Sequence, residues 1–256
     1  MLRHPFSASR GNTVNHDHLS SEDNIDPAET SKFNSHAAQW WDRQGPLRTL
    51  HDINPVRLEF IQQHSRLQGE HFVDVGCGGG VLAESLVIEG ATVTAIDLAE
   101  QAIETARLHA LDSGLAIDYR VMGSWQLAAE EPAGYSGVTC MELLEHVPDP
   151  LAVVKDCAAL LKPGGMAFFA TLNRTPTAFA QAIIAAEHLL RLLPKGTHDY
   201  ARLIRPSELS RWCRESGLEV TRIRGLGYNP LTHGARLRGD CSVNYLLAAR
   251  KSSASS

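Results

Sequence analysis

The chain has 256 residues, with 24 basic side chains against 29 acidic ones and a formal net charge of −5. The length suits one large α/β domain with a well-buried core, and the acidic balance without a basic region favours a small-molecule substrate over nucleic acid. Five dispersed cysteines, with no C-x-x-C pair, argue against a disulfide framework and indicate a reducing compartment.

The two ends of the chain are predicted to be disordered. Residues 1–24 are rich in Ser, Asn and His and contain no apolar core of a signal peptide. A short transit peptide is the alternative, and His16 and His18 are read as solvated side chains rather than metal ligands. Residues 251–256 form a polar tail. No apolar stretch reaches the roughly 18 to 20 residues that cross a bilayer.

Helices and strands then follow in order. Asp26-Pro27 and Asn54-Pro55 each predict a helix start, since proline is tolerated at the first helical position. The predicted helices cover 28–41, 54–65, 81–89, 100–113, 151–161 and 206–216, and the predicted strands cover 73–75, 93–97, 117–121, 137–141, 166–171, 218–224 and 243–250.

Alternation of strands and helices predicts a mostly parallel sheet covered on both faces. No helix separates 218–224 from 243–250, so the last of the seven strands is expected to run antiparallel. Residues 25–250 therefore form one domain, with the first helices as an N-terminal lid.

A glycine turn follows the first strand. Asp74-Val75-Gly76-Cys77-Gly78-Gly79-Gly80 leads into a helix, and Asp97 ends the second strand, where a carboxylate can bind ribose hydroxyls. A dinucleotide fingerprint would need glycine at position 81, but Val81 stands there. The G-x-G-x-G pattern resembles that of Rossmann-like, class I methyltransferases that use S-adenosylmethionine. A glycine turn without a ligand and a nicotinamide oxidoreductase are the weaker readings.

An apolar insert interrupts the alternation at 175–203. Its apolar residues form a broad helical face beside a narrower polar stripe, and at about 16 residues this helix is too short to span a membrane. Pattern alone favours packing against the domain over an interfacial helix on lipid. The apolar residues are Phe179, Ile183, Ile184, Leu189, Leu190, Leu192 and Leu193.

Five segments, the glycine turn among them, make the resemblance specific. They are Asn54-Pro55-Val56-Arg57-Leu58, the glycine turn, Cys140-Met141-Glu142-Leu143-Leu144-Glu145-His146-Val147-Pro148-Asp149-Pro150, Thr171-Leu172-Asn173-Arg174 and Pro194-Lys195-Gly196-Thr197-His198-Asp199. From about residue 25 to 250 the chain resembles the ubiquinone-biosynthesis O-methyltransferases. That resemblance implies two O-methylations, on a polyprenyl hydroxyphenol and on demethylubiquinol, with S-adenosylmethionine as donor.

The resemblance also implies the residues that contact the donor. They are Arg57, Gly76, Asp97 and Met141, and Gly78 belongs to the same turn. Arg57 can pair with the donor carboxylate, and Asp97 can accept hydrogen bonds from the ribose diol. Ser124 and Trp125 match the usual adenine contacts only loosely.

Acceptor chemistry is expected just after residues 137–141. A phenol has a pKa near ~10, so a base or a cation must favour the phenolate. Glu145 and His146 are the catalytic candidates, with His146 as the base. By the resemblance, Glu142, Glu145 and His146 hold Mg²⁺; E-x-x-E-H places the two glutamates on one side if the segment is helical.

The isoprenoid tail of the expected acceptor bears on the role of the insert. Such a substrate is met at the membrane surface, so the resemblance favours the interfacial reading of 175–203, and a bacterial enzyme attached peripherally to the cytoplasmic side of the inner membrane. A biosynthetic complex is a further expected partner. The alternatives are a related methyltransferase for another phenolic small molecule and a donor-binding scaffold without turnover.

Overall fold

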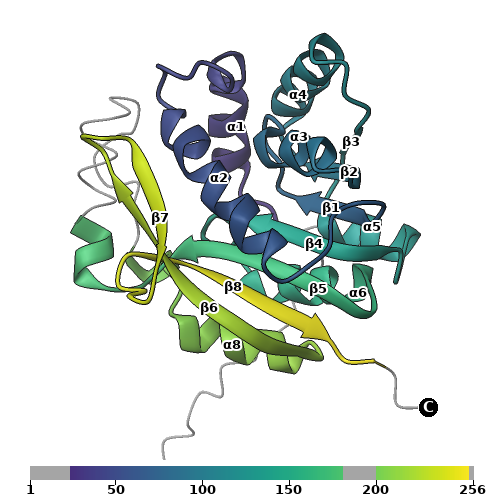
Figure 1. The fold of residues 1–256 in the computed structure, drawn as a ribbon, viewed down its shortest axis with the longest axis vertical. Coiled ribbons are helices and arrows are strands. Elements are labelled where there is room, and N and C mark those ends of the chain that lie inside the picture. The colour runs from purple at the N-terminus through teal and green to yellow at the C-terminus, as the bar shows by residue number, and fades with distance from the viewer. Residues whose placement is uncertain (1–23, 181–199, 254–256) are drawn as a thin grey trace, which may run out of the picture.

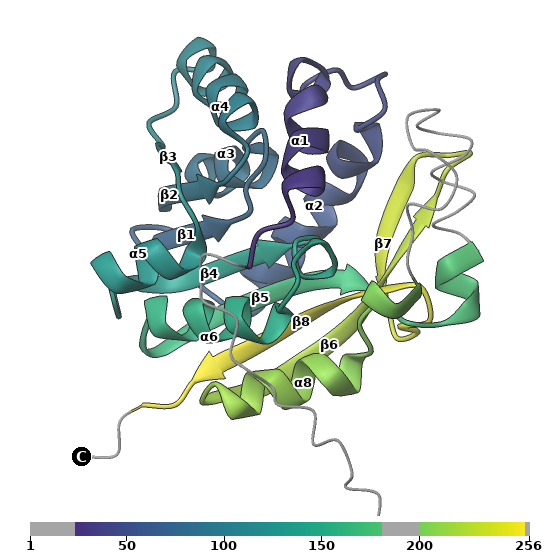
Figure 2. The same ribbon diagram turned by 180° about the vertical axis from the view of Figure 1, so that it is seen from behind.

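The computed structural model describes residues 24–180 and 200–253. Its ribbon has three layers, with a central sheet between two groups of helices (Figures 1 and 2). Residues 1–23 of the predicted disordered end 1–24 lie outside the described residues, as do 181–199 of the insert and 254–256. Asn24 is described, and it is buried and hydrogen-bonded to Asp149, so the prediction of disorder is wrong for this residue.

The sheet has eight strands in the order β3-β2-β1-β4-β5-β8-β6-β7 among the described residues. The pairs from β3 to β5 are parallel, whereas β8 runs antiparallel to both of its neighbours. The antiparallel final strand is therefore confirmed. The strands are β1 (His71–Val75), β2 (Thr92–Asp97), β3 (Asp118–Val121), β4 (Tyr135–Met141), β5 (Leu161–Leu172), β6 (Leu218–Asn229), β7 (Gly234–Arg238) and β8 (Asn244–Lys251).

The predicted total of seven strands is one too few, because β6 continues into a hairpin with β7. β7 alternates exposed and half-buried positions and lacks a buried apolar run, so the sequence gives it no strand signal. β8 also continues to Lys251, one residue into the predicted tail.

The predicted helices begin and end close to their predicted limits except in the N-terminal region, and the helix at Ser124–Glu130 was not predicted. The predicted helix 28–41 ends at Ser35 and is followed by a 3₁₀ turn, and the helix predicted to start at Pro55 starts at Arg48 with Pro55 inside it. The helical elements are α1 (Pro27–Ser35), η2 (Ala37–Gln39), α2 (Arg48–Gln62), α3 (Val81–Ile88), α4 (Glu100–Asp112), α5 (Ser124–Glu130), η3 (Leu144–His146), α6 (Pro150–Leu160), η4 (Tyr200–Arg202) and α8 (Pro206–Glu215).

Two apolar clusters hold the layers together. One joins α2, α3 and α4 to one face of the sheet around Phe60, Leu86 and Phe168. The other joins α5, α6 and α8 to the opposite face around Leu127, Phe169 and other buried side chains. Because both faces are covered, the strands are near-continuous apolar runs, as expected for a parallel sheet.

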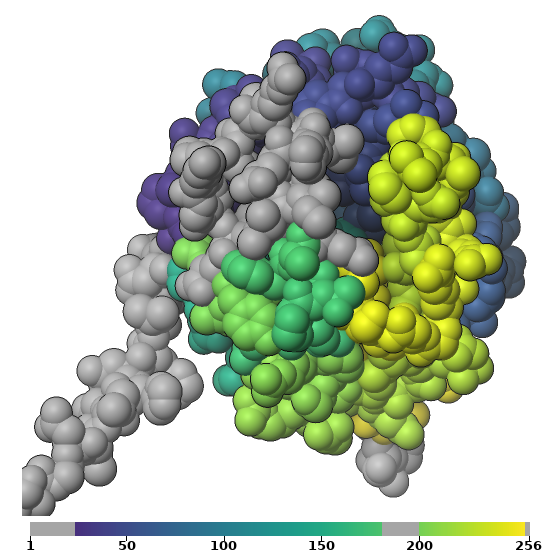
Figure 3. All heavy atoms as spheres, turned by 90° about the vertical axis from the view of Figure 1, so that its left-hand side faces the viewer, coloured from purple at the N-terminus to yellow at the C-terminus, as the bar shows by residue number. Residues whose placement is uncertain are grey.

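The β6–β7 hairpin projects from the sheet toward α2, and the two lie side by side in the space-filling view (Figure 3). Tyr228 on β6 donates a hydrogen bond to Asp52 on α2 at 2.8 Å, and His233 at the hairpin turn lies 3.1 Å from the same carboxylate. None of the helices in the described part of the chain has the length and apolar character that crossing a membrane requires.

Candidate active site

A cavity of about 420 Å³ lies at the carboxyl ends of β1, β2 and β4. This edge is where open α/β sheets bind ligands. The sheet side is lined by the glycine turn, Asp97 and Met141, and the opposite wall comes from α1 and from the start of α2. The predicted donor residues Arg57, Gly76, Gly78, Asp97 and Met141 therefore share one cavity with Glu142 and His146, while their individual roles stay predictions.

The glycine turn is shaped by backbone that other residues adopt at a cost. Gly76, Gly78 and Gly80 have φ angles of 74°, 52° and 85°. A methyl group on Gly78 or Gly79 would overlap the indole of Trp40, which packs directly on the turn. Glycine is thus required here for close approach as well as for the left-handed conformation.

Asp97, at the end of β2, lies beside the glycine turn and is hydrogen-bonded to it. Its carboxylate accepts hydrogen bonds from the backbone N–H of Gly78 at 2.9 Å and of Ala99 at 2.8 Å. Burial raises the pKa of Asp97 above its usual range, and these N–H groups partly oppose that rise. A carboxylate fixed in this way can accept hydrogen bonds from two neighbouring hydroxyls.

Arg57 reaches the cavity from α2. Its guanidinium is buried and pairs with the carboxylate of Glu142, and its Nε has no hydrogen-bond partner within 24–180 and 200–253. Burial raises the pKa of Glu142 above its usual range, and the nearby Arg57 offsets only part of that rise. An unpartnered buried donor is costly, so this position fits a ligand that carries a carboxylate.

The segment after β4 does not form the helix that E-x-x-E-H could have made. Glu142 has a left-handed backbone with φ 49°, and only Leu144–His146 form a single 3₁₀ turn. The glutamates therefore diverge: Glu142 faces Arg57 in the cavity, whereas buried Glu145 accepts a hydrogen bond from Thr171 at 2.8 Å. The helix on which a shared side for both glutamates depended is therefore absent.

Glu145 does not line the cavity. Among the described residues, the hydrogen bond and ion pair of the His146 ring are with Glu29 and with neither of these glutamates. Its Nδ1 lies 2.9 Å from Oε2 of Glu29 on α1. Within 24–180 and 200–253, no three His, Cys, Asp or Glu side chains gather into a group that could hold a metal ion. As arranged, the predicted set of Glu142, Glu145 and His146 does not fit Mg²⁺.

Sequence reasoning missed the partners that α1 and η2 bring to the site. Glu29 is 117 residues from His146 in the chain, and no local pattern connects them. Trp40 gave no signal that it packs on the glycine turn. Ser124 and Trp125, at the start of α5, line the cavity beside Gly123, although the sequence match there was loose.

Comparison with known proteins agrees with this geometry. A family model described as a methyltransferase domain matches residues 25–223. The chain is 54% identical over 229 residues to a ubiquinone biosynthesis O-methyltransferase of Bordetella pertussis, covering 89% of this chain and 95% of the relative. A protein of the same name from Chromobacterium violaceum is 50% identical over 228 residues, covering 89% and 98%. The chain belongs to the ubiquinone biosynthesis O-methyltransferase family.

Solved structures agree with membership of this family at the level of the fold. Magnesium protoporphyrin IX methyltransferase from Synechocystis, with bound SAH, has a TM-score of 0.64 at 16% identity, covering 88% of this chain and 98% of that chain. A methyltransferase from Thermotoga maritima has a TM-score of 0.63 at 14% identity, covering 86% and 98%. The first has SAH bound and the second is named a SAM-dependent methyltransferase, so the Rossmann-like methyltransferase fold is established for this member of the family.

Proposed function

We propose that this chain transfers methyl groups from S-adenosylmethionine to the hydroxyls of ubiquinone precursors. The two acceptors are a polyprenyl hydroxyphenol or catechol and 3-demethylubiquinol. The observation that carries the proposal is one cavity that joins the glycine turn and Asp97 to an imidazole at its other side. A related methyltransferase acting on another phenolic small molecule is the alternative.

The donor side of the cavity suits each part of S-adenosylmethionine. We assign Asp97 to the ribose diol and Arg57 to the carboxylate of the methionine portion. Both side chains line the cavity, and the Nε of Arg57 has no hydrogen-bond partner among the described residues. Gly76 and Gly78 line the cavity with backbone alone, because neither residue has a side chain to project toward the methionine portion. The donor, when bound, supplies a methyl group on an electrophilic sulfonium centre.

On the acceptor side, the chain must hold the phenol in line and remove its proton. We assign His146 as the general base, since it lines the cavity and imidazole is the side chain that most often serves as a general base in enzymes. The phenol proton passes to His146 while the phenol oxygen takes the methyl group and the sulfonium becomes a neutral thioether. Glu145, buried against Thr171, supports the backbone of this segment instead of touching the acceptor.

One assay tests the proposal. Purified protein is supplied with labelled donor and either a short-chain prenyl catechol or short-chain demethylubiquinol, each with and without EDTA. We expect label to enter both acceptors and His146→Ala to lower kcat by about 10²- to 10⁴-fold. No turnover of either acceptor would refute the proposal, and turnover of only an unrelated phenol would support the alternative.

The assay with EDTA tests whether the reaction depends on a divalent cation. Assembling Glu142, Glu145 and His146 around a cation would require Glu142 to leave Arg57 and Glu145 to leave Thr171. Loss of turnover in EDTA that added Mg²⁺ restores would support the predicted metal set. Turnover unchanged by EDTA would leave the imidazole to act alone.

We also propose that the protein works at the surface of a membrane, on the cytoplasmic side of the bacterial inner membrane. The support is the sequence of 175–203, most of which lies outside the described residues, together with an acceptor whose tail resides in lipid. Apolar side chains on one helical face and nearby Arg202 and Arg205, both exposed, are typical of an interfacial segment.

Replacing Ile184 and Leu190 together by Asp should abolish pelleting with anionic liposomes. The physical reason is that each charge placed on the apolar face must be desolvated on insertion. Gln181→Glu, a change in the polar stripe, serves as the control and should still pellet. Equal pelleting of the double variant and the natural chain would refute the membrane proposal.

A further inference from the structure

The β6–β7 hairpin extends past the sheet at the edge where the cavity lies. β6 runs in the same direction as β5, since β8 is antiparallel to both strands. Its pairing with β8 ends at Gly225, and residues 226–229 pair with β7 alone. The turn of the hairpin therefore lies beyond the carboxyl edge of the sheet, beside α2, whose Thr49 and Leu50 line the cavity (Figure 3).

The turn itself holds an apolar side chain out in solvent. Leu231 is 89% exposed, the largest fraction for any exposed large apolar residue within 24–180 and 200–253. The side chain of Asn229 accepts hydrogen bonds from the backbone N–H groups of Leu231 at 2.9 Å and of Thr232 at 3.4 Å, which fixes the turn in this shape. A single exposed leucine is common on protein surfaces, so the charges around it decide what it can contact.

Those charges are positive. Residues 220–239 contain four arginines and no acidic residue, although the chain as a whole has a formal net charge of −5. Arg236 and Arg238 are exposed on one face of β7, and they lie opposite Gly227 and Gly225 in the register of the hairpin. β6 therefore places no side chain against them. Among the described residues neither guanidinium has a hydrogen-bond or ion-pair partner, so both charges are free to bind an external anion.

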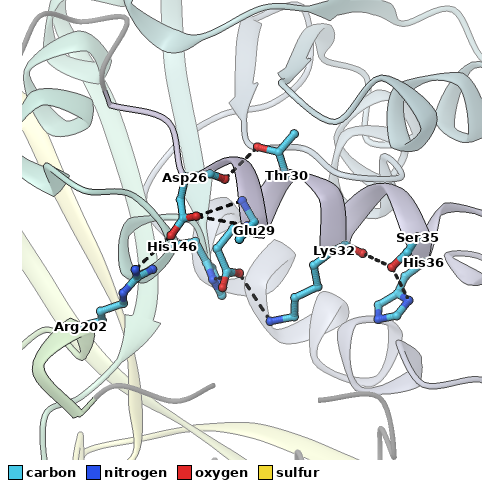
Figure 4. A network of polar contacts seen from close by, with 9 residues as sticks. Asp26, Glu29, Thr30, Lys32, Ser35, His36, His146 and Arg202 are labelled. Atoms are coloured by element: carbon cyan, nitrogen blue, oxygen red, sulfur yellow. Dashed lines mark hydrogen bonds and ion pairs between the residues drawn. The ribbon is translucent and has the colours of Figure 1, made fainter. Parts of the chain in front are cut away.

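An exposed leucine beside unpaired guanidinium groups matches the surface of an anionic bilayer. Guanidinium groups bind phosphate through paired N–H groups, and an apolar side chain can enter the boundary between headgroups and acyl chains. The proposed interfacial insert 175–203 lies at the same edge. It follows the carboxyl end of β5, and near its own end Arg202 pairs at 3.0 Å with Asp26, which lines the cavity (Figure 4).

We propose that the β6–β7 hairpin is a second membrane contact, in which Leu231 enters the headgroup region and Arg236 and Arg238 bind the phosphate groups of anionic lipids. This rests on the proposed function, in which the acceptor is met at a membrane surface. Two linked contacts bind more tightly than either alone. They also fix the orientation of the protein, so that the carboxyl edge of the sheet and its cavity face the lipid that holds the acceptor tail.

The test measures co-pelleting with phosphatidylcholine vesicles, with and without phosphatidylglycerol, at low and high salt. Replacing Arg236 and Arg238 together by Gln should lower partition into the anionic vesicles about 25-fold at low salt, because each arginine near such a surface contributes about fivefold. The difference should shrink at high salt, which screens the attraction. Leu231→Ser should lower partition into both kinds of vesicle at least about tenfold, because it removes apolar burial without changing charge.

A matched double variant controls for the loss of two positive charges. Arg66 and Arg250 are both exposed and lie at the opposite edge of the sheet, before β1 and near the end of β8. Replacing both by Gln should leave partition at the natural value. All the hairpin variants should keep the natural melting temperature and methylate a soluble short-chain catechol at the natural rate, because the substituted side chains do not line the cavity.

Two results would overturn the proposal while the natural chain still pellets with vesicles. One is natural partition for both hairpin variants. The other is a natural chain that sediments as a dimer and hairpin variants that sediment as monomers, which would assign the hairpin to a second copy of the chain. If the natural chain pellets with no vesicle, the proposed membrane attachment itself fails, so the two failures are distinguishable within one experiment.

Discussion

At the scale of single residues, the glycine turn combines two constraints that are usually separate. Gly78 has a left-handed backbone, and its α-carbon also faces the indole of Trp40 at contact distance. Its N–H in addition donates to the carboxylate of Asp97. One residue therefore fixes the turn, the aromatic side chain that covers it, and the acid expected to hold the ribose.

Gly78→Ala should consequently weaken donor binding. Left-handed backbone costs a non-glycine residue about 1–2 kcal/mol, and the added methyl group must displace Trp40 or move the N–H away from Asp97. We expect the affinity for S-adenosylhomocysteine to fall at least about tenfold, a change of roughly 1.4 kcal/mol. Calorimetric titration of the variant and of the natural chain measures this difference.

Gly114→Ala is the matched control for that measurement. Gly114 follows α4 with φ 66°, but no atom lies within 4 Å of the position its methyl group would take. This control should lose stability from backbone strain alone and keep the natural affinity. Equal affinities for all three proteins would show that crowding at Gly78 has no part in donor binding.

At the scale of elements, the start of a helix is predicted correctly where interactions within one turn are enough to determine it. Asp26-Pro27 was expected to begin a helix and does, because a side-chain cap and a proline at the first helical position act within one turn. The same reasoning placed a helix start at Pro55 and was wrong. α2 begins seven residues earlier, at Arg48, and buries Ile53, Phe60 and Ile61 against the sheet. That packing outweighs the local preference of proline for a helix start.

Elements without a strong periodic signal were missed for a different reason. α5 is a helix of seven residues, too short for an apolar period to emerge. β7 is a strand only because β6 pairs with it, since its own residues alternate between exposed and half-buried positions. Pairing with a neighbour is information that a single segment does not contain.

The candidate site shows the same division. The glycine turn, Asp97 and the residues after β4 were found because strand ends of a parallel sheet meet at one edge. The pairing of Glu29 with His146 was not, because it depends on how α1 lies across that edge. The metal set stays a prediction: Glu142 has a left-handed backbone with φ of 49°, and within the described residues Glu142, Glu145 and His146 do not gather into a group that could hold an ion.

At the scale of the whole molecule, carboxylates gather at one edge of the sheet. Buried Asp74 on β1 and half-buried Asp97 on β2 and Glu142 after β4 all line the cavity, and desolvation raises the pKa of each. Arg57 is a buried cation beside them and pairs with Glu142. Charges removed from water without full compensation cost stability. The fold therefore carries a destabilising cluster where a ligand is expected, a trade that proteins make at functional sites.

Asp74 allows this cost to be measured. It is 3% exposed and accepts a hydrogen bond from the Thr139 hydroxyl at 2.6 Å. Burial raises its pKa from 3.8 to about 6, despite that hydrogen bond. Between these two values the Asp74 carboxyl binds more protons in the folded state than in the unfolded state. The contribution of Asp74 to the free energy of unfolding therefore falls as pH rises from about 4 to 6 and is constant above that. Each pKa unit is equivalent to about 1.4 kcal/mol, so above pH 6 the cost reaches roughly 3 kcal/mol.

Asp74→Asn should therefore stabilise the protein at pH 8 by up to about 3 kcal/mol, because the amide keeps the acceptor for Thr139 and carries no charge. The gain should shrink as pH falls below 6 and vanish near pH 4, which urea unfolding at a series of pH values can follow. Asp112→Asn, an exposed change at the end of α4, should stay within about 0.5 kcal/mol at every pH. A variant that is destabilised at pH 8, or a gain that does not depend on pH, would show that the Asp74 carboxylate is compensated in the folded state and that its charge is no burden on the fold.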